Sequence, residues 1–249
     1  MSKLSVVILT REKERYLEQV LASLSFADEI ILVVDSVRSG SRSEKIGRKY
    51  KAKTFLHKFK NYEEQKNFGI EKSSSDWILN LDSDEIVPPE LGEEMETVIK
   101  SKNYNGYMMP SKNFIGNRWV RFGGLYPDYH IRLFKKTKGE FFGSVHESVK
   151  LEGNFSYLKN PVIHYTYASL SDYWAKVKKY STLEAERDFR DGKKIPWFLY
   201  FKIPLRFTKL YFIQLGFLDG FYGFASAAFL SYYLYLKFAK IKSLEKQCA

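Results

Sequence analysis

Two aspartates, Asp82 and Asp84, stand one residue apart in the segment LDSDE at residues 81–85. They follow the apolar run WILNL at residues 77–81, which predicts a buried strand. Carboxylates at this spacing reach one point if the chain turns after the strand. Mg²⁺ prefers oxygen ligands and commonly binds one or two carboxylates together with substrate phosphates. The pattern therefore predicts a site for Mg²⁺ or Mn²⁺, and a metal there would neutralise a departing diphosphate.

The acidic segment has two other interpretations. A helix–loop–helix calcium loop needs glycine at its sixth position, and counting from Asp82 that position is Val87, so this interpretation fails. A solvated turn that precedes a helix starting near Pro89 stays open. The position at the end of an apolar strand, within a strand–helix pattern, favours the metal site.

The elements that would position these carboxylates alternate between strand and helix. Buried strands are expected at residues 4–9, 30–34, 53–57 and 77–81, and helices at 16–24, 41–50, 62–73 and from Pro89 to about Lys100. This alternation is typical of a doubly wound parallel sheet in an α/β domain. Ligands of such sheets bind beyond the carboxyl ends of the strands, where this chain has Thr10, Asp35 and Asp82.

The pattern changes after Ser101. Short strands are expected at residues 107–109, 119–122, 131–134 and 162–165, and a charged helix at 170–190. We therefore divide the chain into an α/β domain at 1–194, with a nucleotide-binding half at 1–101 and an acceptor half at 102–194, and a tail at 195–249.

Several segments resemble glycosyltransferase family 2, namely SVVILT, DEIILVVDS, EEQKNFGIEKSSSDWILNLDSDE, LYPDYHIRLF and VHES. They are most similar to the branch of small inverting enzymes that add a sugar to the lipopolysaccharide core, and the similarity includes GFLDGFYGF near the C-terminus. The resemblance implies a fold of the GT-A type and a nucleotide-sugar donor, with a UDP-sugar expected. It implies that Thr10 and Asp35 line the nucleoside pocket. By the same resemblance, Asp82 lies against the ribose and the metal, and Asp84 binds the metal directly.

The chain departs from the family pattern at two places. Glu12 stands where the family often has Asn, and SVRSGSRS follows Asp35 where an aspartate in a small-residue turn is common. These differences leave the donor sugar and the detailed nucleotide contacts open, and they do not touch the metal motif. Asp35 has a second interpretation as a helix N-cap.

An inverting transfer needs a carboxylate base that takes the proton from the acceptor hydroxyl as it attacks the anomeric carbon. Asp128 in LYPDYHIRLF and Glu147 in GSVHES are the two candidates. Asp128 is favoured, because the block PD-x-x-x-R carries the resemblance in the acceptor half. A surface salt bridge is the alternative for either residue.

Four further residues are candidates for contacts with the donor. Arg132 is expected to bind the diphosphate through its guanidinium, and Lys66 to do the same from the helix at 62–73. Both can also be ordinary surface cations. His146 is the preferred third metal ligand and His164 the alternative, and a structural role is open for both histidines.

The C-terminal tail is basic and aromatic. The net charge of the chain is +11, and residues 190–249 hold ten Lys or Arg against three Asp or Glu. Asp219 is the only formal charge between Leu210 and Leu236. A full membrane span is disfavoured, because an aspartate at mid-bilayer costs roughly 2.5–3.5 kcal/mol. We expect two aromatic helices that lie in the membrane interface, with their cations reaching lipid phosphates, and a buried hairpin is the alternative.

These observations together predict an inverting, metal-dependent glycosyltransferase that acts on a lipid-linked or lipopolysaccharide-core glycan. The single cysteine, Cys248, and a start without a signal-peptide pattern predict a cytoplasmic location. Together with the tail, they predict a peripheral protein at the cytoplasmic face of the inner membrane. A polyprenyl-phosphate sugar synthase of the same fold is one alternative. A basic nucleic-acid-binding protein is another, and it is disfavoured because the basic tail alternates with long aliphatic runs and no nucleic-acid motif appears.

Overall fold

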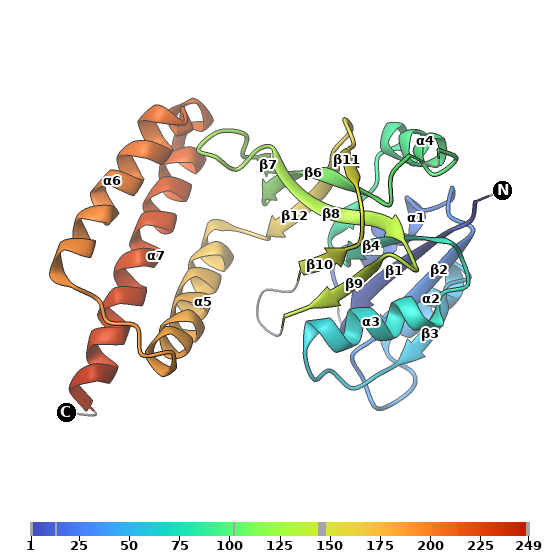
Figure 1. Ribbon diagram of the computed structural model, residues 1–249, viewed down its shortest axis with the longest axis horizontal. Helices are drawn as coiled ribbons and strands as arrows, with labels where there is room; N and C mark the ends of the chain where they lie inside the picture. Colours follow the sequence, from blue (N-terminus) through green and yellow to red (C-terminus); the bar gives the residue numbers. More distant parts are fainter. Residues whose placement is uncertain (1, 13, 102, 144–147, 248–249) are drawn as a thin grey trace. The chain divides into compact units, whose positions relative to one another are not determined.

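The computed structural model describes residues 2–12, 14–101, 103–143 and 148–247 (Figure 1). The chain forms two compact units, each with a core of its own. The first unit combines residues 1–111 with 128–164, and the second combines residues 112–127 with 165–249. The division predicted at residue 194 was based on expected function and not on packing, and it stays a prediction.

The first half of the first unit alternates strand and helix as predicted (Figure 1). Its elements are β1 (Leu4–Thr10), α1 (Leu17–Ala22), β2 (Glu29–Val34), α2 (Arg42–Lys49), β3 (Lys53–Leu56), α3 (Tyr62–Lys72) and β4 (Trp77–Asp82). The strands pair in parallel in the order β3-β2-β1-β4. Strands β1, β2 and β4 are buried along nearly their whole length, because helices cover both faces of the sheet and apolar side chains fill both sides.

Two polar side chains start the helices that follow the strand ends. Ser41 caps α2 by accepting a hydrogen bond from the backbone N–H of Glu44, and Asn61 caps α3 by accepting one from Glu64. The interpretation of Asp35 as a helix N-cap is therefore wrong, since Ser41 fills that position for the helix after β2.

The sheet continues beyond β4 with antiparallel strands, so it is mixed rather than wholly parallel. The order runs β4-β8-β6-β12-β5, and β8 is antiparallel to both β4 and β6. The new elements are β5 (Glu85–Ile86), α4 (Pro89–Val98), β6 (Gly106–Ile115), β8 (Asp128–Lys135) and β12 (Val162–Tyr167). Short strands β7 (Arg118–Trp119) and β11 (Phe155–Tyr157) pair with β6, and β9 (Gly139–Phe142) pairs with β10 (Ser148–Leu151) in a separate ribbon.

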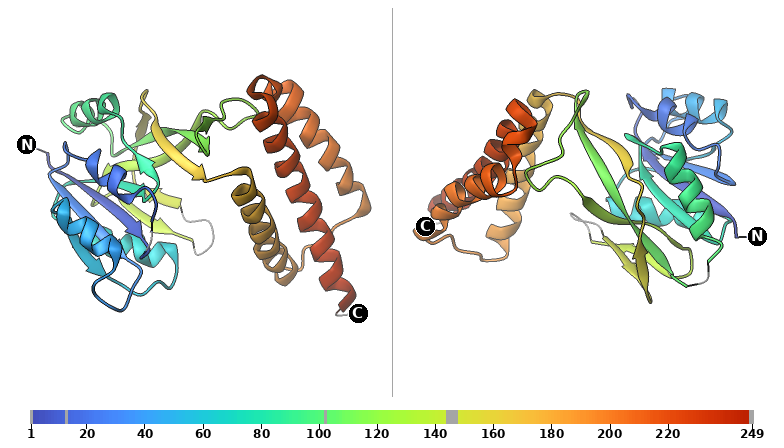
Figure 2. Two further views of the ribbon diagram at one scale, coloured as in Figure 1. Left: turned by 180° about the vertical axis from the view of Figure 1, so that it is seen from behind. Right: turned by 90° about the horizontal axis from the view of Figure 1, so that it is seen from above.

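The second unit is mainly helical. It contains α5 (Leu170–Arg190), η1 (Trp197–Phe201), α6 (Lys202–Thr208), η2 (Lys209–Ile213), η3 (Gly216–Asp219) and α7 (Gly220–Gln247). Helix α7 lies between α5 and α6 (Figure 2). The predicted helix at 170–190 and the two helical segments expected in the tail are confirmed.

Neither helical segment of the tail reaches the length and hydropathy of a membrane span by itself, and this holds for every helix in the described ranges. The pair formed by Trp197–Ile213 and Gly216–Gln247, bent by 70°, passes that test by length and composition only.

Candidate active site

The two aspartates of the acidic segment lie on a tight turn that a third carboxylate closes. Asp82 ends β4, residues 83 and 84 form the turn, and Glu85 begins β5. The Glu85 side chain is fully buried, and its Oε2 accepts a hydrogen bond from the backbone N–H of Asp82 at 3.0 Å. The chain therefore does turn after the strand, as the metal-site prediction requires. Sequence reasoning gave Glu85 no role, although it is the third acid of LDSDE.

Arg132 forms an ion pair with Glu85 beneath the turn. Arg132 comes from β8, its side chain is only 9% exposed, and its Nη2 contacts Oε1 of Glu85. Burial raises the pKa of Glu85 to about 7, although the Arg132 guanidinium opposes the shift. The guanidinium thus stabilises a buried carboxylate, and the predicted contact between Arg132 and a diphosphate stays a prediction.

Lys66 lies on the other side of the turn. Its Nζ is 3.7 Å from Oδ1 of Asp82 and 4.9 Å from the centre of the Phe141 ring, and its side chain is buried. Burial acts to raise the pKa of Asp82, but nearby cations, Lys66 foremost, lower it overall. Asp82 is therefore ionised near neutral pH, which is the state a metal ligand needs.

His164 approaches the turn from β12. The pairing of His164 with Glu85 between β12 and β5 sets its position. Its Nε2 is 3.6 Å from Oδ1 of Asp84, and its Nδ1 is 3.8 Å from Oε1 of Glu85. The structure thus brings the alternative histidine, His164, to the acidic turn. The preferred one, His146, lies outside the described residues.

The donor set of the turn fits a cation that a substrate helps to bind. Within residues 2–12, 14–101, 103–143 and 148–247, no three His, Cys, Asp or Glu side chains converge as a complete metal site. Asp82 and Asp84 offer two carboxylates, and Asp82 also lines a cavity. Since Mg²⁺ commonly takes one or two carboxylates and fills its remaining positions with water and phosphate oxygens, this set suffices for a metal bound together with a diphosphate.

A cavity of about 440 Å³ opens beside Asp82. It lies within the size range of small-molecule sites, roughly 300–1,000 Å³. Its walls come from α3, β4, β6, β8, the β9–β10 ribbon and β12, and include Lys66, Asn80, Asp82, Met108, Tyr129, His130, Ile131, Arg132, Phe141, Ser148, Val149 and His164.

Asn80 is a cavity residue that sequence reasoning missed. It is 2% exposed, and its Oδ1 has no hydrogen-bond partner among the residues that the structure describes. It stands two residues before Asp82 in β4, so both side chains project from the same face of the strand. An amide inside the apolar run WILNL was the available signal, because a buried polar group without a protein partner points to a ligand.

The two predicted catalytic carboxylates have different outcomes. Asp128 begins β8, its Oδ1 lies 3.0 Å from Nε2 of His130, and His130 lines the cavity. Asp128 is thus connected to the cavity through one side chain. Glu147 lies outside the described residues. His130, to which the sequence analysis assigned no role, links Asp128 to the cavity wall.

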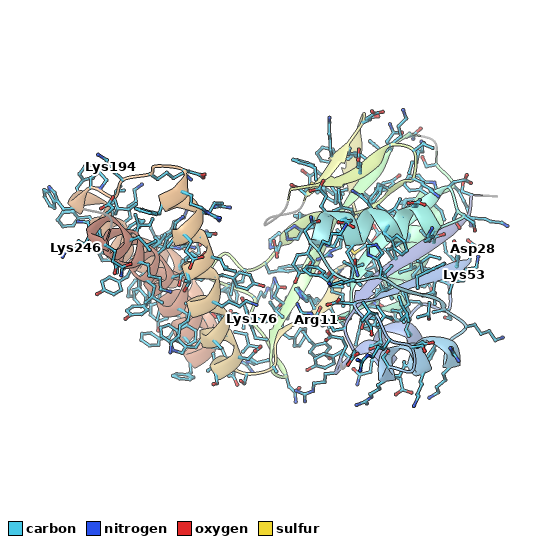
Figure 3. All side chains as sticks on the ribbon, turned by 90° about the horizontal axis from the view of Figure 1, so that it is seen from below. Arg11, Asp28, Lys53, Lys176, Lys194 and Lys246 are labelled. Carbon is cyan, nitrogen blue, oxygen red and sulfur yellow. The ribbon has the colours of Figure 1, made fainter. Side chains whose placement is uncertain are left out.

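Thr10 and Asp35 lie together at the carboxyl edge of the parallel strands. The backbone N–H of Asp35 donates to the carbonyl of Thr10 at 2.8 Å, and β1 lies between β2 and β4 in the sheet. Asp35, Thr10 and Asp82 therefore follow one another along this edge. Figure 3 labels Arg11, next to Thr10, and shows Asp28 and Lys53 at the opposite end of the strands.

Both side chains already have contacts within the protein. The Thr10 hydroxyl is buried and contacts Ser43 Oγ at 3.4 Å and the carbonyl of Arg11 at 3.2 Å. Oδ1 of Asp35 accepts a hydrogen bond from the backbone N–H of Phe59 at 3.0 Å. Their predicted contacts with a nucleoside stay predictions.

Comparison with known proteins identifies several similar chains. A family model described as glycosyl transferase family 2 matches residues 5–165. An uncharacterized glycosyltransferase of Rickettsia bellii (strain RML369-C) is 28% identical over 270 residues, covering 99% of this chain and 88% of the relative. The lipopolysaccharide core biosynthesis glycosyltransferase LpsC of Rhizobium meliloti (strain 1021) is 27% identical over 246 residues, covering 96% and 91%. The crystal structure of S. aureus TarS 1-349 superposes with a TM-score of 0.48 at 14% identity, covering 98% and 90%.

Proposed function

The chain belongs to glycosyl transferase family 2, and we propose that it is an inverting, metal-dependent enzyme that transfers a sugar from a nucleotide-sugar donor to a lipid-linked glycan. The observation that carries the proposal is the acidic turn at Asp82 and Asp84, which lies at the carboxyl edge of the parallel strands of a mixed sheet and beside a ligand-sized cavity. In this proposal the fold is of the GT-A type and the donor is a UDP-sugar.

The donor site is proposed along the edge that carries Asp35, Thr10 and Asp82. The nucleoside lies at Asp35 and Thr10, and the diphosphate lies near Asp82 and Asp84. A divalent metal, Mg²⁺ or Mn²⁺, would be held by these two carboxylates and would supply charge neutralisation for the diphosphate. Lys66, 3.7 Å from Asp82, adds a fixed positive charge at the same place.

Asp128 is proposed as the general base. Its carboxylate accepts the proton of the acceptor hydroxyl while that oxygen forms a bond to the anomeric carbon. The bond from the anomeric carbon to the diphosphate oxygen breaks at the same time, so the configuration inverts. The contact of 3.0 Å with His130 fixes the orientation of the carboxylate. Glu147 is the alternative base.

The acceptor is proposed to be a lipopolysaccharide-core or other lipid-linked glycan. The supporting relative is LpsC of Rhizobium meliloti, whose name assigns it to lipopolysaccharide core biosynthesis and which aligns with 96% of this chain. An acceptor anchored in lipid requires the enzyme at a membrane surface. The proposal therefore includes peripheral association with the cytoplasmic face of the inner membrane through the basic, aromatic tail.

Release of nucleoside diphosphate tests the donor half of this proposal. Purified protein is incubated with UDP-, GDP- and ADP-sugars in the presence of Mg²⁺, Mn²⁺ or EDTA. Cleavage of one donor is expected, and both EDTA and Asp84→Ala should reduce it at least about a hundredfold. Asp76→Ala is the matched control, because Asp76 is exposed just before the amino end of β4. Equal rates in Asp84→Ala and Asp76→Ala would exclude the metal site.

A further inference from the structure

Between α5 and α7 lies a long stretch, residues 192–218, whose charged residues are all cations. Residues 192–218 contain five cations and no Asp or Glu. The cations are Lys193, Lys194, Lys202, Arg206 and Lys209. Most of this stretch forms the continuous helical segment Trp197–Ile213, which carries Lys202, Arg206 and Lys209. These cations favour an anionic partner surface.

The same helical segment exposes a row of large apolar side chains. Phe198, Phe201, Leu205, Phe212 and Ile213 are each between 54% and 73% exposed. Most follow one another at intervals of three or four residues or multiples of a helical turn, so they share one face. Exposed Lys202 and Lys209 are seven residues apart, two turns, and border this row. We call this face of Trp197–Ile213 the α6 stripe.

The opposite side of the segment packs on α7. The rings of Phe207 and Tyr211 each lie 5.8 Å from the ring of Phe224, and Tyr200 contacts Phe238 at 5.7 Å. The two faces of the segment are therefore distinct. One fills the interior of the helical unit, and the α6 stripe stays outside it.

Asp219, the only acid in the apolar run of the tail, is directed into the protein. It is 7% exposed, and its Oδ2 accepts hydrogen bonds from the backbone N–H groups of Arg121 and Phe122 at 2.8 and 2.7 Å. An unpaired aspartate would oppose contact of this region with lipid. Because the protein itself satisfies this carboxylate, its charge is not presented on the α6 stripe.

Helix α7 is fixed to α5 by a partly buried ionic cluster. Nζ of Lys237 lies 3.0 Å from Oε2 of Glu184 and 2.5 Å from Oδ2 of Asp188, which is 4% exposed. Lys240 donates to the hydroxyls of Ser181 and Thr182. A membrane span by α7 would break this cluster or draw charged α5 into the bilayer. The cluster therefore favours a helical unit that stays intact and meets lipid with one face only.

We propose that the α6 stripe binds the surface of an anionic lipid bilayer, with Trp197–Ile213 lying in the membrane plane. The apolar row enters the boundary between headgroups and acyl chains, while Lys202 and Lys209 contact lipid phosphates. Exposed apolar side chains, bordering cations and a concealed acid together select an anionic bilayer. This inference deepens the membrane association within the proposed function, and its test needs no transferase activity.

Vesicle binding by the full chain tests the stripe. Sedimentation is measured with vesicles of phosphatidylcholine alone and of phosphatidylcholine mixed with phosphatidylglycerol. Wild-type protein should bind the anionic vesicles more tightly, and added salt should weaken that binding. Phe198→Ser with Phe201→Ser and Leu205→Ser should lower the partition coefficient more than about tenfold.

The cations have a matched control. Lys202→Gln with Lys209→Gln should remove most of the preference for anionic vesicles, whereas Lys178→Gln with Lys179→Gln removes the same charge from exposed positions of α5 and should leave it. If both double variants lose this preference equally, the proposal for the α6 stripe is wrong and general charge attraction explains the binding. Unchanged binding by the folded triple variant, checked by circular dichroism, would also overturn it.

Two further measurements distinguish lipid binding from self-association and from donor chemistry. Light scattering gives the oligomeric state without lipid. If wild type is a dimer that binds no vesicles, and the triple variant is a monomer, the α6 stripe binds a second copy of the chain instead of a bilayer. Donor cleavage is measured in parallel without vesicles. If wild type does not cleave a donor, the proposed transferase site is contradicted, while the vesicle result is unaffected. If the triple variant still cleaves the donor, the α6 stripe acts separately from donor chemistry.

Discussion

The guanidinium of Arg132 and the carboxylate of Glu85 form an ion pair that is almost entirely removed from solvent, with side chains 9% and 0% exposed. Glu85 also accepts the hydrogen bond that closes the turn at Asp82. The ion pair therefore connects β8 to the acidic turn and fixes the position of the predicted metal ligands. Its contribution to stability can be measured by mutation.

Removal of either partner of this pair is expected to destabilise the protein strongly. Arg132→Met or Glu85→Gln alone leaves part of a buried ion pair uncompensated, which costs about 3–5 kcal/mol. The free energy of unfolding of the double variant should fall by less than the sum of the two single decreases, because the double variant leaves no unpaired charge. Urea unfolding measures the three free energies.

An exposed ion pair supplies the control for this cycle. Lys138 and Glu152 lie 3.2 Å apart with side chains 43% and 69% exposed, so Lys138→Met should cost less than about 1 kcal/mol. Strict additivity of Arg132→Met and Glu85→Gln would contradict the coupling inferred from their contact.

Asn80 should show opposite effects on stability and activity. Its buried Oδ1 has no hydrogen-bond partner within the described part of the chain, so Asn80→Leu removes an unsatisfied polar atom. The free energy of unfolding is expected to rise by about 1 kcal/mol, while kcat/KM for the donor falls at least about tenfold. Denaturation and steady-state kinetics measure the two effects. Ile78→Leu, two residues earlier on the same face, is the control, and a destabilised Asn80→Leu would mean that the amide has a structural role.

The parallel half of the fold was predictable mainly because strands β1, β2 and β4 are almost entirely apolar. Burial on both faces removes the need for polar positions, so LSVVIL and IILVV indicate strands without any tertiary information. Strands β5, β9, β10 and β11 have two to four residues and partly exposed side chains, so their pattern does not differ from that of loops. Their pairing is decided by long-range contacts.

The site was predictable where one short segment carries the chemistry and obscure where distant segments meet. Asp82 and Asp84 were found because the strand end and the acids are contiguous. The partners of Glu85 could not be found, since Arg132 and His164 reach it from strands far along the chain. Asp35 was open to an N-cap interpretation because nucleoside binding and helix capping both use a carboxylate that follows a strand. The structure decided against the cap, since the Ser41 side chain accepts the capping hydrogen bond of α2.

Asp128→Asn is expected to lower kcat by about 10²–10⁴-fold, because an amide cannot accept the acceptor proton. Donor binding, measured by calorimetry with the nucleoside diphosphate, should stay intact. His130→Gln should have a smaller effect on kcat, since it alters only the residue that contacts Asp128 at 3.0 Å. Full activity in Asp128→Asn would transfer the role of base to Glu147.

Glu29 predicts how stability depends on acid. Burial acts to raise its pKa, but contacts with Lys53, Ser5 and Ser74 outweigh burial and lower the pKa to about 2. An ordinary carboxyl in the unfolded chain titrates at about 4.3, so the stabilisation is complete above that pH and is lost as pH falls toward about 2.

The matching variant is Glu29→Gln. It should be less stable than wild type by up to about 3 kcal/mol at pH 7, and the difference should shrink as pH falls from about 4.5 to about 2. Denaturant unfolding over this pH range measures it. A difference independent of pH would assign the loss to packing rather than to charge. Glu71→Gln, at an exposed position of α3, is the control and should change little.

Asp219 should hold the segment that leads into Asp128. Its Oδ2 accepts from the backbone N–H groups of Arg121 and Phe122, and the carbonyl of Gln214 accepts from Gly123 at 2.9 Å, so residues 121–123 depend on the helical break near Asp219. Asp219→Ala removes two charge-assisted hydrogen bonds, each worth about 1.5–3 kcal/mol. Amide hydrogen exchange at Arg121 and Phe122 should then accelerate at least about tenfold. Asp219→Asn keeps an acceptor oxygen and should show a smaller change, and exposed Asp191→Ala should show none.

The same variant should affect the acceptor kinetics. Because residues 121–127 run directly into Asp128, the KM for the acceptor should rise in Asp219→Ala while donor cleavage without acceptor stays at the wild-type rate. Unaltered exchange at both amides would show that Asp219 does not order this segment.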